Sequence, residues 1–176
     1  SVGTLANGPL WTAGKAGGAL SFDGVNGYVS RTSLSGLAPG NTPHTVAAWV
    51  KVNALPSYRA WILQLGNDGS GSHHWLLNSS GVTQFGKWNG EQLQPVLPVG
   101  PWKHLALTFN GATLTGYVDG VAIGSKATSF SLGGVPLTVA QQHIGENYFN
   151  GVVDDVRVYN RALTAAEVGS LASGGV

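Results

Sequence analysis

The chain has 176 residues with 27 glycines, 43% hydrophobic residues and only 10% charged residues, which excludes a disordered chain or a coiled coil and indicates one turn-rich β domain. The absence of cysteine excludes disulfides, zinc–thiolate sites and cysteine nucleophiles. A formal net charge of +1 is too balanced for a protein that binds nucleic acid through its phosphates, and no apolar run is long enough to span a membrane.

Short apolar or alternating runs, each beside an Asn-Gly or Asp-Gly pair, follow one another along the chain. In the first third these runs are ALSF (19–22), YVSRTSL (28–34) and TVAAWVKV (45–52). Asn-Gly and Asp-Gly pairs favour the type I′ turn, whose twist matches that of paired strands. This region is therefore predicted to form antiparallel strands.

The clearest hairpin signal lies between residues 102 and 124. There LALTF, Asn110-Gly111, ATLTGYV, Asp119-Gly120 and VAIG follow one another, which predicts three antiparallel strands in sequence order. A last strand is predicted at VVDDVRVY (152–159). Strands so closely spaced leave no room for crossover helices, so the pattern predicts an all-β sandwich.

The end of the chain carries the one predicted helix. The segment from Thr164 to Glu167 has the pattern of a capping box and is followed by the apolar residues Val168 and Leu171. We expect a short C-terminal helix that covers one edge of the sandwich. No linker, charge run or duplication divides the sequence, so residues 1–176 are predicted to form a single domain.

Several of these segments, in this order, resemble the motifs of bacterial laminin-G-like domains in the concanavalin A-like lectin/glucanase superfamily. The matching stretches are 19–24, 28–29, 45–51, 100–106, 117–120 and 149–163. The resemblance spans about residues 18–171 and implies a concanavalin A-like jelly roll of two curved antiparallel sheets. Such domains include sugar-binding modules, adhesion modules and glycosidases, so the fold alone does not define the function. Because the chain neither starts with Met nor contains one, we expect a module of a larger secreted protein.

The acids do not form a glycosidase pattern. The eight Asp and Glu residues are scattered, and no strand would place a set of carboxylates on one sheet face. Asp154 and Asp155 are adjacent and would point to opposite faces of an extended strand. None of the five histidines has metal-ligand spacing or an evident nucleophile partner. We therefore predict that the domain is not an enzyme.

Asp154 indicates a possible metal site. It shares strand parity with Val156 and Val158, which predicts that its carboxylate faces the core and needs a partner. In the family that the chain resembles, this region and the Phe-Asp-Gly turn often lie near a structural calcium. The resemblance therefore implies calcium ligands from Asp23, Asn26 and Asp154.

The calcium prediction has an alternative. Family members commonly carry Asp directly before the tyrosine, where this chain has Gly27. Asp154 could instead bond to backbone or pair with Arg157 or Arg161, while Asp23 caps a turn.

The tryptophans carry the prediction of a binding site. Flat rings stack on the apolar face of a sugar while polar side chains bind its hydroxyls, and six tryptophans exceed the needs of one core of this size. Trp49 and Trp102 lie in the family motifs and are assigned to the core. Trp88, beside an Asn-Gly turn, is the best candidate for an exposed ring, whereas Trp61 and Trp75 could serve either binding or packing.

Most of the predicted ligand-binding residues lie between residues 58 and 94, where the family pattern is weakest, and one comes from a later loop. The set is Trp88, Trp75, Trp61, Arg59, Gln64, His73, His74, Asn89, Gln92 and Tyr148.

These residues predict a non-catalytic carbohydrate-binding module that tethers an attached enzyme to a polysaccharide or oligosaccharide. The low net charge favours a neutral glycan. The alternatives are a protein-binding or adhesion module, which would expose a flat apolar patch, a spacer domain without ligand, and lastly a glycoside hydrolase. We expect a secreted, extracellular monomer that binds neither nucleic acid nor a membrane.

Overall fold

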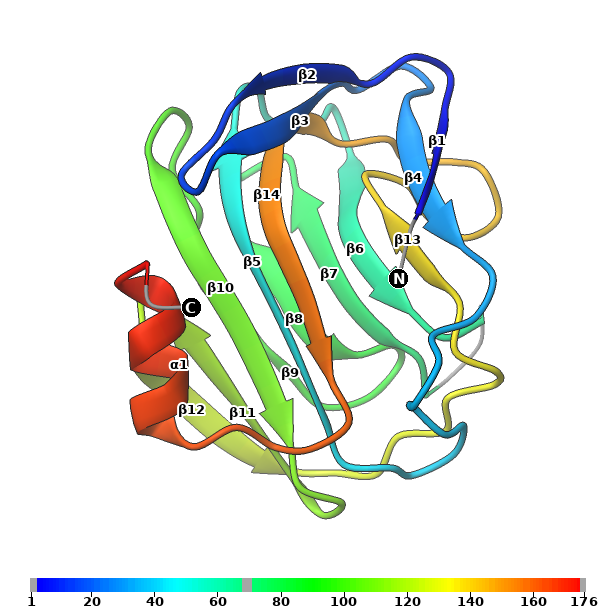
Figure 1. Ribbon diagram of the computed structural model, residues 1–176, viewed down its shortest axis with the longest axis vertical. Coiled ribbons are helices and arrows are strands. Elements are labelled where there is room, and N and C mark those ends of the chain that lie inside the picture. The colour runs from blue at the N-terminus through cyan, green and yellow to red at the C-terminus, as the bar shows by residue number, and fades with distance from the viewer. Residues whose placement is uncertain (1–2, 68–70, 175–176) are drawn as a thin grey trace.

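The computed structural model describes residues 3–67 and 71–174, which form strands and one short helix (Figure 1). The elements are β1 (Thr4–Ala6), β2 (Leu10–Ala13), β3 (Gly18–Asp23), β4 (Tyr28–Arg31), β5 (His44–Val52), β6 (Arg59–Leu65), β7 (His73–Asn78), β8 (Thr83–Lys87), β9 (Gln92–Leu93), β10 (Trp102–Phe109), β11 (Thr113–Val118), β12 (Val121–Ala127), β13 (Leu137–Val139), β14 (Asn150–Tyr159) and α1 (Ala165–Ala172). No helix within these ranges is long and apolar enough to cross a membrane.

The strands form two seven-stranded sheets. The first sheet has the order β1-β4-β13-β6-β7-β8-β9, and the second has the order β12-β11-β10-β5-β14-β3-β2. All pairings between these strands are antiparallel. Figure 1 views the molecule from the second sheet, with the first sheet behind it. The predicted jelly-roll β-sandwich is confirmed.

The predicted three-stranded unit between residues 102 and 124 is present as β10, β11 and β12. Asp119 and Gly120 have φ angles of 51° and 80°, and a type I′ turn requires positive φ at both positions. In the preceding turn the Asn110 side chain accepts hydrogen bonds from the backbone N–H groups of Ala112 and Thr113. Both hairpins are therefore specified locally by their turn residues.

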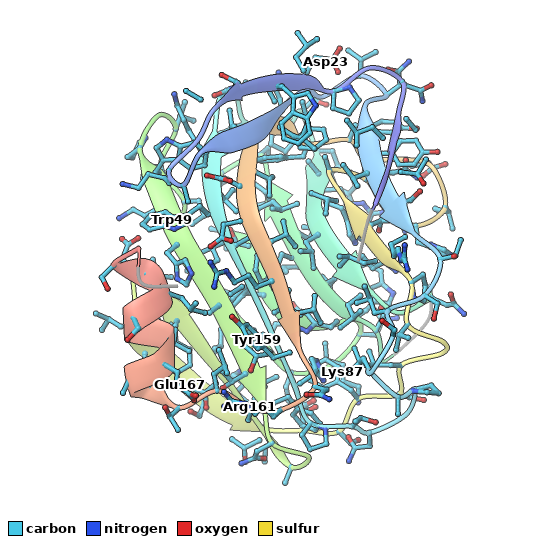
Figure 2. All side chains as sticks on the ribbon, viewed as in Figure 1. Asp23, Trp49, Lys87, Tyr159, Arg161 and Glu167 are labelled. Carbon is cyan, nitrogen blue, oxygen red and sulfur yellow. The ribbon has the colours of Figure 1, made fainter. Side chains whose placement is uncertain are left out.

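The core lies between the two sheets and is built from alternating residues of the strands. In β5, for example, Val46, Ala48 and Val50 point inward and are at most 1% exposed. Trp49 and Trp102, predicted to be core residues, are instead half-buried on the outer face of the second sheet, and Figure 2 shows Trp49 there. Trp49 alternates with the inward Ala48 and Val50 of β5, and Trp102 has the opposite parity to the inward Leu105 and Leu107 of β10.

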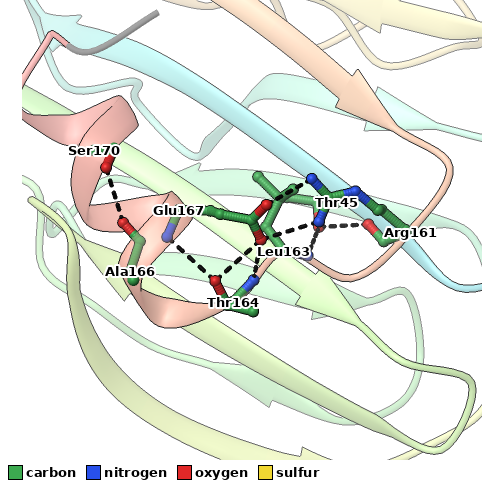
Figure 3. Close-up of polar contacts among 7 residues, drawn as sticks. All are labelled: Thr45, Arg161, Leu163, Thr164, Ala166, Glu167 and Ser170. Atoms are coloured by element: carbon green, nitrogen blue, oxygen red, sulfur yellow. Dashed lines mark hydrogen bonds and ion pairs between the residues drawn. The ribbon is translucent and has the colours of Figure 1, made fainter.

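The capping box predicted at the helix start is confirmed (Figure 3). Thr164 accepts a hydrogen bond from the Glu167 backbone N–H, and the Glu167 carboxylate accepts one from the Thr164 backbone N–H. The Arg161 guanidinium donates to the same carboxylate and holds the pKa of Glu167 at about 2. These contacts fix where α1 begins.

The helix covers the outer face of the second sheet at its β12 edge (Figure 1). Val168 and Leu171 are buried against Ala47 of β5, Ala106 of β10 and Tyr117 of β11. The small alanines let the helix approach the strands closely. Among the described residues, no helix covers the outer face of the first sheet.

Candidate functional site

The outer face of the first sheet presents polar and aromatic residues from β6 and β7. Trp61 pairs with Leu76, and Gln64 pairs with His74. Trp61 and Gln64 are three residues apart, yet both face outward because a β-bulge at Ile62 inserts one extra residue between them. The bulge therefore brings Trp61 and His74 onto one surface.

Five residues on this face form what we call the aromatic–guanidinium cluster: Tyr58, Arg59, Trp61, His74 and Trp88. The Cζ atom of Arg59 lies 5.0 Å from the ring centre of Tyr58, 5.0 Å from that of Trp61 and 6.0 Å from that of Trp88. The Trp88 ring lies 5.5 Å from that of Trp61 and meets the His74 ring edge to face at 5.2 Å. Three aromatic rings thus surround one guanidinium group.

The members of the cluster differ in exposure. Tyr58 is 69% exposed and Trp88 is half-buried, whereas Trp61 is 2% exposed and lies beneath them. Trp88, predicted to be an exposed ring, is therefore partly covered. The most exposed ring of the cluster is that of Tyr58.

Polar atoms of the cluster are buried. His74 is fully buried, and a backbone group of Ser72 lies near its ring and partly offsets the effect of burial on its pKa. Burial lowers its pKa to about 4, so the imidazole is neutral at pH 7. The Nε atom of Arg59 is also buried without a partner in this part of the chain. These nitrogens lie beneath the surface, so a ligand on this face would meet the rings of Tyr58 and Trp88 and the outer part of Arg59.

The backbone holds Trp88 over the sheet. Its N–H donates to the carbonyl of Ser72 at 2.9 Å, and its carbonyl accepts from the N–H of Gly71 at 3.3 Å. The next residue, Asn89, has a φ angle of 54°, as the tight turn requires. The backbone of Trp88, directly after β8, is thus held by Gly71 and Ser72, directly before β7, and this pairing positions the ring.

A loop between β13 and β14 borders the cluster. The backbone N–H of Trp61 donates to the carbonyl of Asn147 at 2.8 Å. The backbone N–H of His143 donates to the side-chain oxygen of Gln64 at 3.1 Å. Gln64 is 2% exposed and also donates to the carbonyl of Gly66. Gln64, predicted to bind ligand, thus holds this loop against the sheet.

The structure brings four of the predicted ligand-binding residues together, namely Arg59, Trp61, His74 and Trp88. Gln92 lies two strands from His74 on the same face, with its amide donating to the carbonyl of Lys87, and Asn89 is exposed in the adjoining turn. The half-buried Tyr148 donates its hydroxyl to the carbonyl of Gly145 in the bordering loop.

Two other predicted ligand residues, His73 and Trp75, face the core and not this surface, so their assignment to the binding site is wrong. They share parity with the buried Leu77. The Trp75 indole N–H donates to Nε2 of His73 at 2.9 Å, so Nδ1 of His73 carries the proton and donates to Nε2 of His44 at 3.1 Å. His44 in turn donates to the carbonyl of Thr42 at 2.8 Å.

This buried chain of hydrogen bonds requires both imidazoles to be neutral. Burial lowers the pKa of His44 and, more strongly, that of His73, and each of the two acceptor nitrogens would be lost on protonation. The two histidines are therefore structural.

Tyr58 was missed by the sequence analysis. It lies in the loop before β6, in a segment without hydrophobic periodicity. Only its position next to Arg59 in the sequence could have indicated that it belongs to the binding site. Its contact with Arg59 and its exposure place it at the centre of the candidate site.

Asp154 does not face the core as its parity predicted. In the pairing of β14 with β5, Asp154 lies opposite Trp49 and Arg157 lies opposite Ala47, so the strand contains one extra residue. That residue, Asp155, bulges with a φ angle of 48°. The bulge reverses the parity and puts Asp154 on the outer face of the second sheet. Asp155 pairs there with Arg157 at 2.8 Å, so the prediction that the two acids point to opposite faces is wrong.

The carboxylate of Asp154 is fully engaged with backbone. Its Oδ2 atom accepts hydrogen bonds from the N–H groups of Lys15 and Ala16 at 2.7 and 2.9 Å, and its Oδ1 atom accepts one from Asp155 at 2.7 Å. The carboxylate thereby fastens the loop between β2 and β3 to β14.

The three predicted calcium ligands do not fit a single ion. Asp23 pairs with Asn150, four residues before Asp154 in the same strand, which separates the two aspartates by about 13 Å. The Asp23 side chain caps a turn by accepting from the N–H of Val25, and Asn26 is exposed. The structure therefore favours the alternative assignment, a turn cap at Asp23 and a backbone acceptor at Asp154. Within the described ranges, no three His, Cys, Asp or Glu residues gather as a metal site.

Comparison with protein families identifies the class of this domain. The model described as the concanavalin A-like lectin/glucanases superfamily, Laminin_G_3, matches residues 22–169. The chain belongs to this family, which confirms the resemblance drawn from its sequence motifs. Comparison with curated proteins gives no match.

Solved structures with the same fold belong to larger proteins of several kinds. Domain 4 of AbnA, a GH43 extracellular arabinanase from Geobacillus stearothermophilus, in complex with arabinotriose, is 22% identical with a TM-score of 0.78, covering 97% of this chain and 87% of that one. The binding domain of Paraclostridial Mosquitocidal Protein 1 is 16% identical with a TM-score of 0.74, covering 98% and 47%. Trypanosoma rangeli sialidase in complex with the inhibitor DANA is 18% identical with a TM-score of 0.69, covering 91% and 28%. At these identities the likeness shows the fold alone.

Proposed function

We propose that this domain is a non-catalytic carbohydrate-binding module and that a sugar binds at the aromatic–guanidinium cluster. The observation that carries the proposal is that the exposed Tyr58 ring and the half-buried Trp88 ring both lie next to the Arg59 guanidinium. Aromatic rings stack on sugar faces, and a guanidinium group bonds to hydroxyls. An adhesion surface would instead expose a flat apolar patch.

The relatives support a sugar ligand. The AbnA domain was solved with arabinotriose, and it is one domain of an extracellular enzyme. By analogy, we infer that this chain tethers an attached enzyme to a polysaccharide outside the cell.

The acids support a non-catalytic role. The cluster contains no carboxylate, and a glycosidase needs two of them beside the scissile bond. Six of the seven acids in the described residues are bonded to other groups: Asp23, Glu91, Asp119, Asp154, Asp155 and Glu167. The seventh, Glu146, is exposed in the loop that borders the cluster, and one carboxylate does not make the pair that a glycosidase needs.

Replacing Tyr58 tests the site with little effect on folding. If Tyr58 stacks on a sugar, its ring covers about 60–100 Å² of apolar surface, worth about 1.5–2.5 kcal/mol. Tyr58→Ala should therefore weaken binding about tenfold or more. Because the ring is 69% exposed, the free energy of unfolding should change by less than about 0.5 kcal/mol. Isothermal titration with a glycan selected from an array that includes arabinotriose gives the affinity, and urea denaturation gives the stability.

Trp11→Ala is the matched control, because Trp11 in β2 is 70% exposed and lies in the other sheet. This variant should bind the glycan like the wild type. Loss of affinity in Trp11→Ala with normal binding by Tyr58→Ala would move the site to the β2 edge. Binding of no glycan by the wild type would reject the proposed function and favour the adhesion alternative.

A further inference from the structure

Arg59 has no anionic partner among residues 3–67 and 71–174. The ion pairs found among the described residues join Lys103 to Asp119, Arg157 to Asp155 and Arg161 to Glu167. Within the same ranges, the Arg59 side chain forms neither an ion pair nor a hydrogen bond, and its polar contacts are with aromatic rings. A partly buried charge is ordinarily paired, so the missing partner points to a ligand.

The rings fix the guanidinium group in place. Tyr58 and Trp61 each lie 5.0 Å from its Cζ atom, and Trp88 closes a third side at 6.0 Å. Contacts with ring faces attract the cation but leave its outward N–H groups without acceptors. A planar guanidinium held in this way presents two parallel donors, which match the two oxygens of a carboxylate.

Arg59 is the one cation of the aromatic–guanidinium cluster. Lys87 directly precedes Trp88 but pairs with the inward-facing His73, so its strand parity places it on the other face of the sheet. Glu91, three residues after Trp88, accepts a hydrogen bond from Thr128 at 2.6 Å. Glu146, in the bordering loop, is exposed and forms no ion pair with Arg59. The balanced net charge, which favoured a neutral glycan, thus hides an unpaired cation at the site.

We propose that the glycan bound at the aromatic–guanidinium cluster carries a carboxylate, as a uronic or sialic acid does, and that Arg59 pairs with it. This inference rests on the proposed function, because it names the chemical class of the sugar at the same site. The sugar ring stacks on Tyr58 and Trp88 while its carboxylate meets Arg59. Arg59 is then the residue that determines specificity.

The experiment compares matched acidic and neutral glycans by isothermal titration. The probes are trigalacturonate against galactotriose and 3′-sialyllactose against lactose. We expect the acidic member of at least one pair to bind about tenfold or more tightly, with the preference reduced at 0.5 M NaCl. Arg59→Gln should lower the affinity for the acidic glycan to that for its neutral partner, and Arg59→Lys should restore it only in part, since an ammonium group does not bind in a bidentate way.

Lys87→Gln is the control for a general effect of positive charge and should keep most of the preference. The near-ultraviolet circular dichroism of Arg59→Gln should match that of the wild type, which shows that the tryptophans remain packed. Equal affinities for both members of each pair, with Tyr58→Ala still impaired, would overturn this inference and leave the proposed function intact. An equal loss in Lys87→Gln and Arg59→Gln would also overturn it. If no probe binds and the glycan array is negative as well, the proposed function fails together with the inference.

Discussion

Lowering the pH from 7 to 5 should destabilise the protein by about 2 kcal/mol through His74 alone. Burial lowers the pKa of His74 to about 4, whereas an unfolded histidine titrates near 6.5. Burial also lowers the pKa values of His44, His73 and His104, which add to the loss in the same direction.

The sign of this effect follows from proton uptake. Because the native pKa values lie below the unfolded value, the unfolded state binds more protons below pH 6.5. The full stability is therefore present above pH 6.5 and decreases as the pH falls toward the native pKa values. For a domain with a total stability of about 5–15 kcal/mol, this loss is a large fraction.

Urea denaturation at pH 7 and pH 5 measures the effect. His74→Gln removes one buried titrating ring and should reduce the pH dependence by about 2 kcal/mol. His143→Gln, in the exposed part of the loop between β13 and β14, is the matched control for the loss of a histidine side chain. Equal free energies of unfolding at both pH values in the wild type would contradict the neutral state of the buried histidines.

Asp154→Ala should reduce the free energy of unfolding by about 2–4 kcal/mol. The carboxylate accepts three backbone hydrogen bonds, and its removal leaves the loop at Lys15 and Ala16 without its attachment to β14. Asp155→Ala is the matched control. It removes an ion pair with Arg157 between partly exposed side chains and should lower stability by about 1 kcal/mol or less.

This pair of variants also tests the calcium prediction. Because Asp154 bonds to backbone and lies far from Asp23, its replacement should have the same effect in excess calcium and in EDTA. Thermal or urea denaturation under both conditions gives the comparison. A destabilisation by Asp154→Ala that occurs only with calcium present would show that Asp154 is a ligand after all.

The sequence predicts the local features of this fold well. The Asp119-Gly120 hairpin and the capping box of Thr164 and Glu167 form as expected, because turn and cap geometries depend on residues within a few positions of one another. The family motifs predicted the jelly roll of two antiparallel sheets. These features require no knowledge of contacts between distant segments.

The wrong predictions concern which face of a sheet a side chain occupies, and they arise from a β-bulge in one strand and from the alternation of side chains in another. The bulge at Asp155 puts Asp154 on the opposite face from the one that strict alternation predicts. A correct reading of parity in β7 would have placed His73 and Trp75 with the buried Leu77, leaving His74 facing outward.

The candidate site itself depends on contacts between segments. The loop before β6 supplies Tyr58, and the end of β8 supplies Trp88, which the Ser72 carbonyl and the Gly71 N–H hold over Trp61. No local pattern predicts that these rings meet around Arg59. The sequence could identify the region and four of the residues, but not the arrangement.

The central claim, that a glycan binds at the aromatic–guanidinium cluster, is tested most directly by the six tryptophan indole N–H signals in a nitrogen-15 NMR spectrum. The signals are assigned with single Trp→Phe variants and followed during titration with the glycan that binds. We expect the signals of Trp61 and Trp88 to shift and saturate, while those of Trp49 and Trp102, on the outer face of the second sheet, stay in place. Saturable shifts of Trp49 and Trp102 with unchanged Trp61 and Trp88 signals would contradict the assignment and place the binding site on the second sheet.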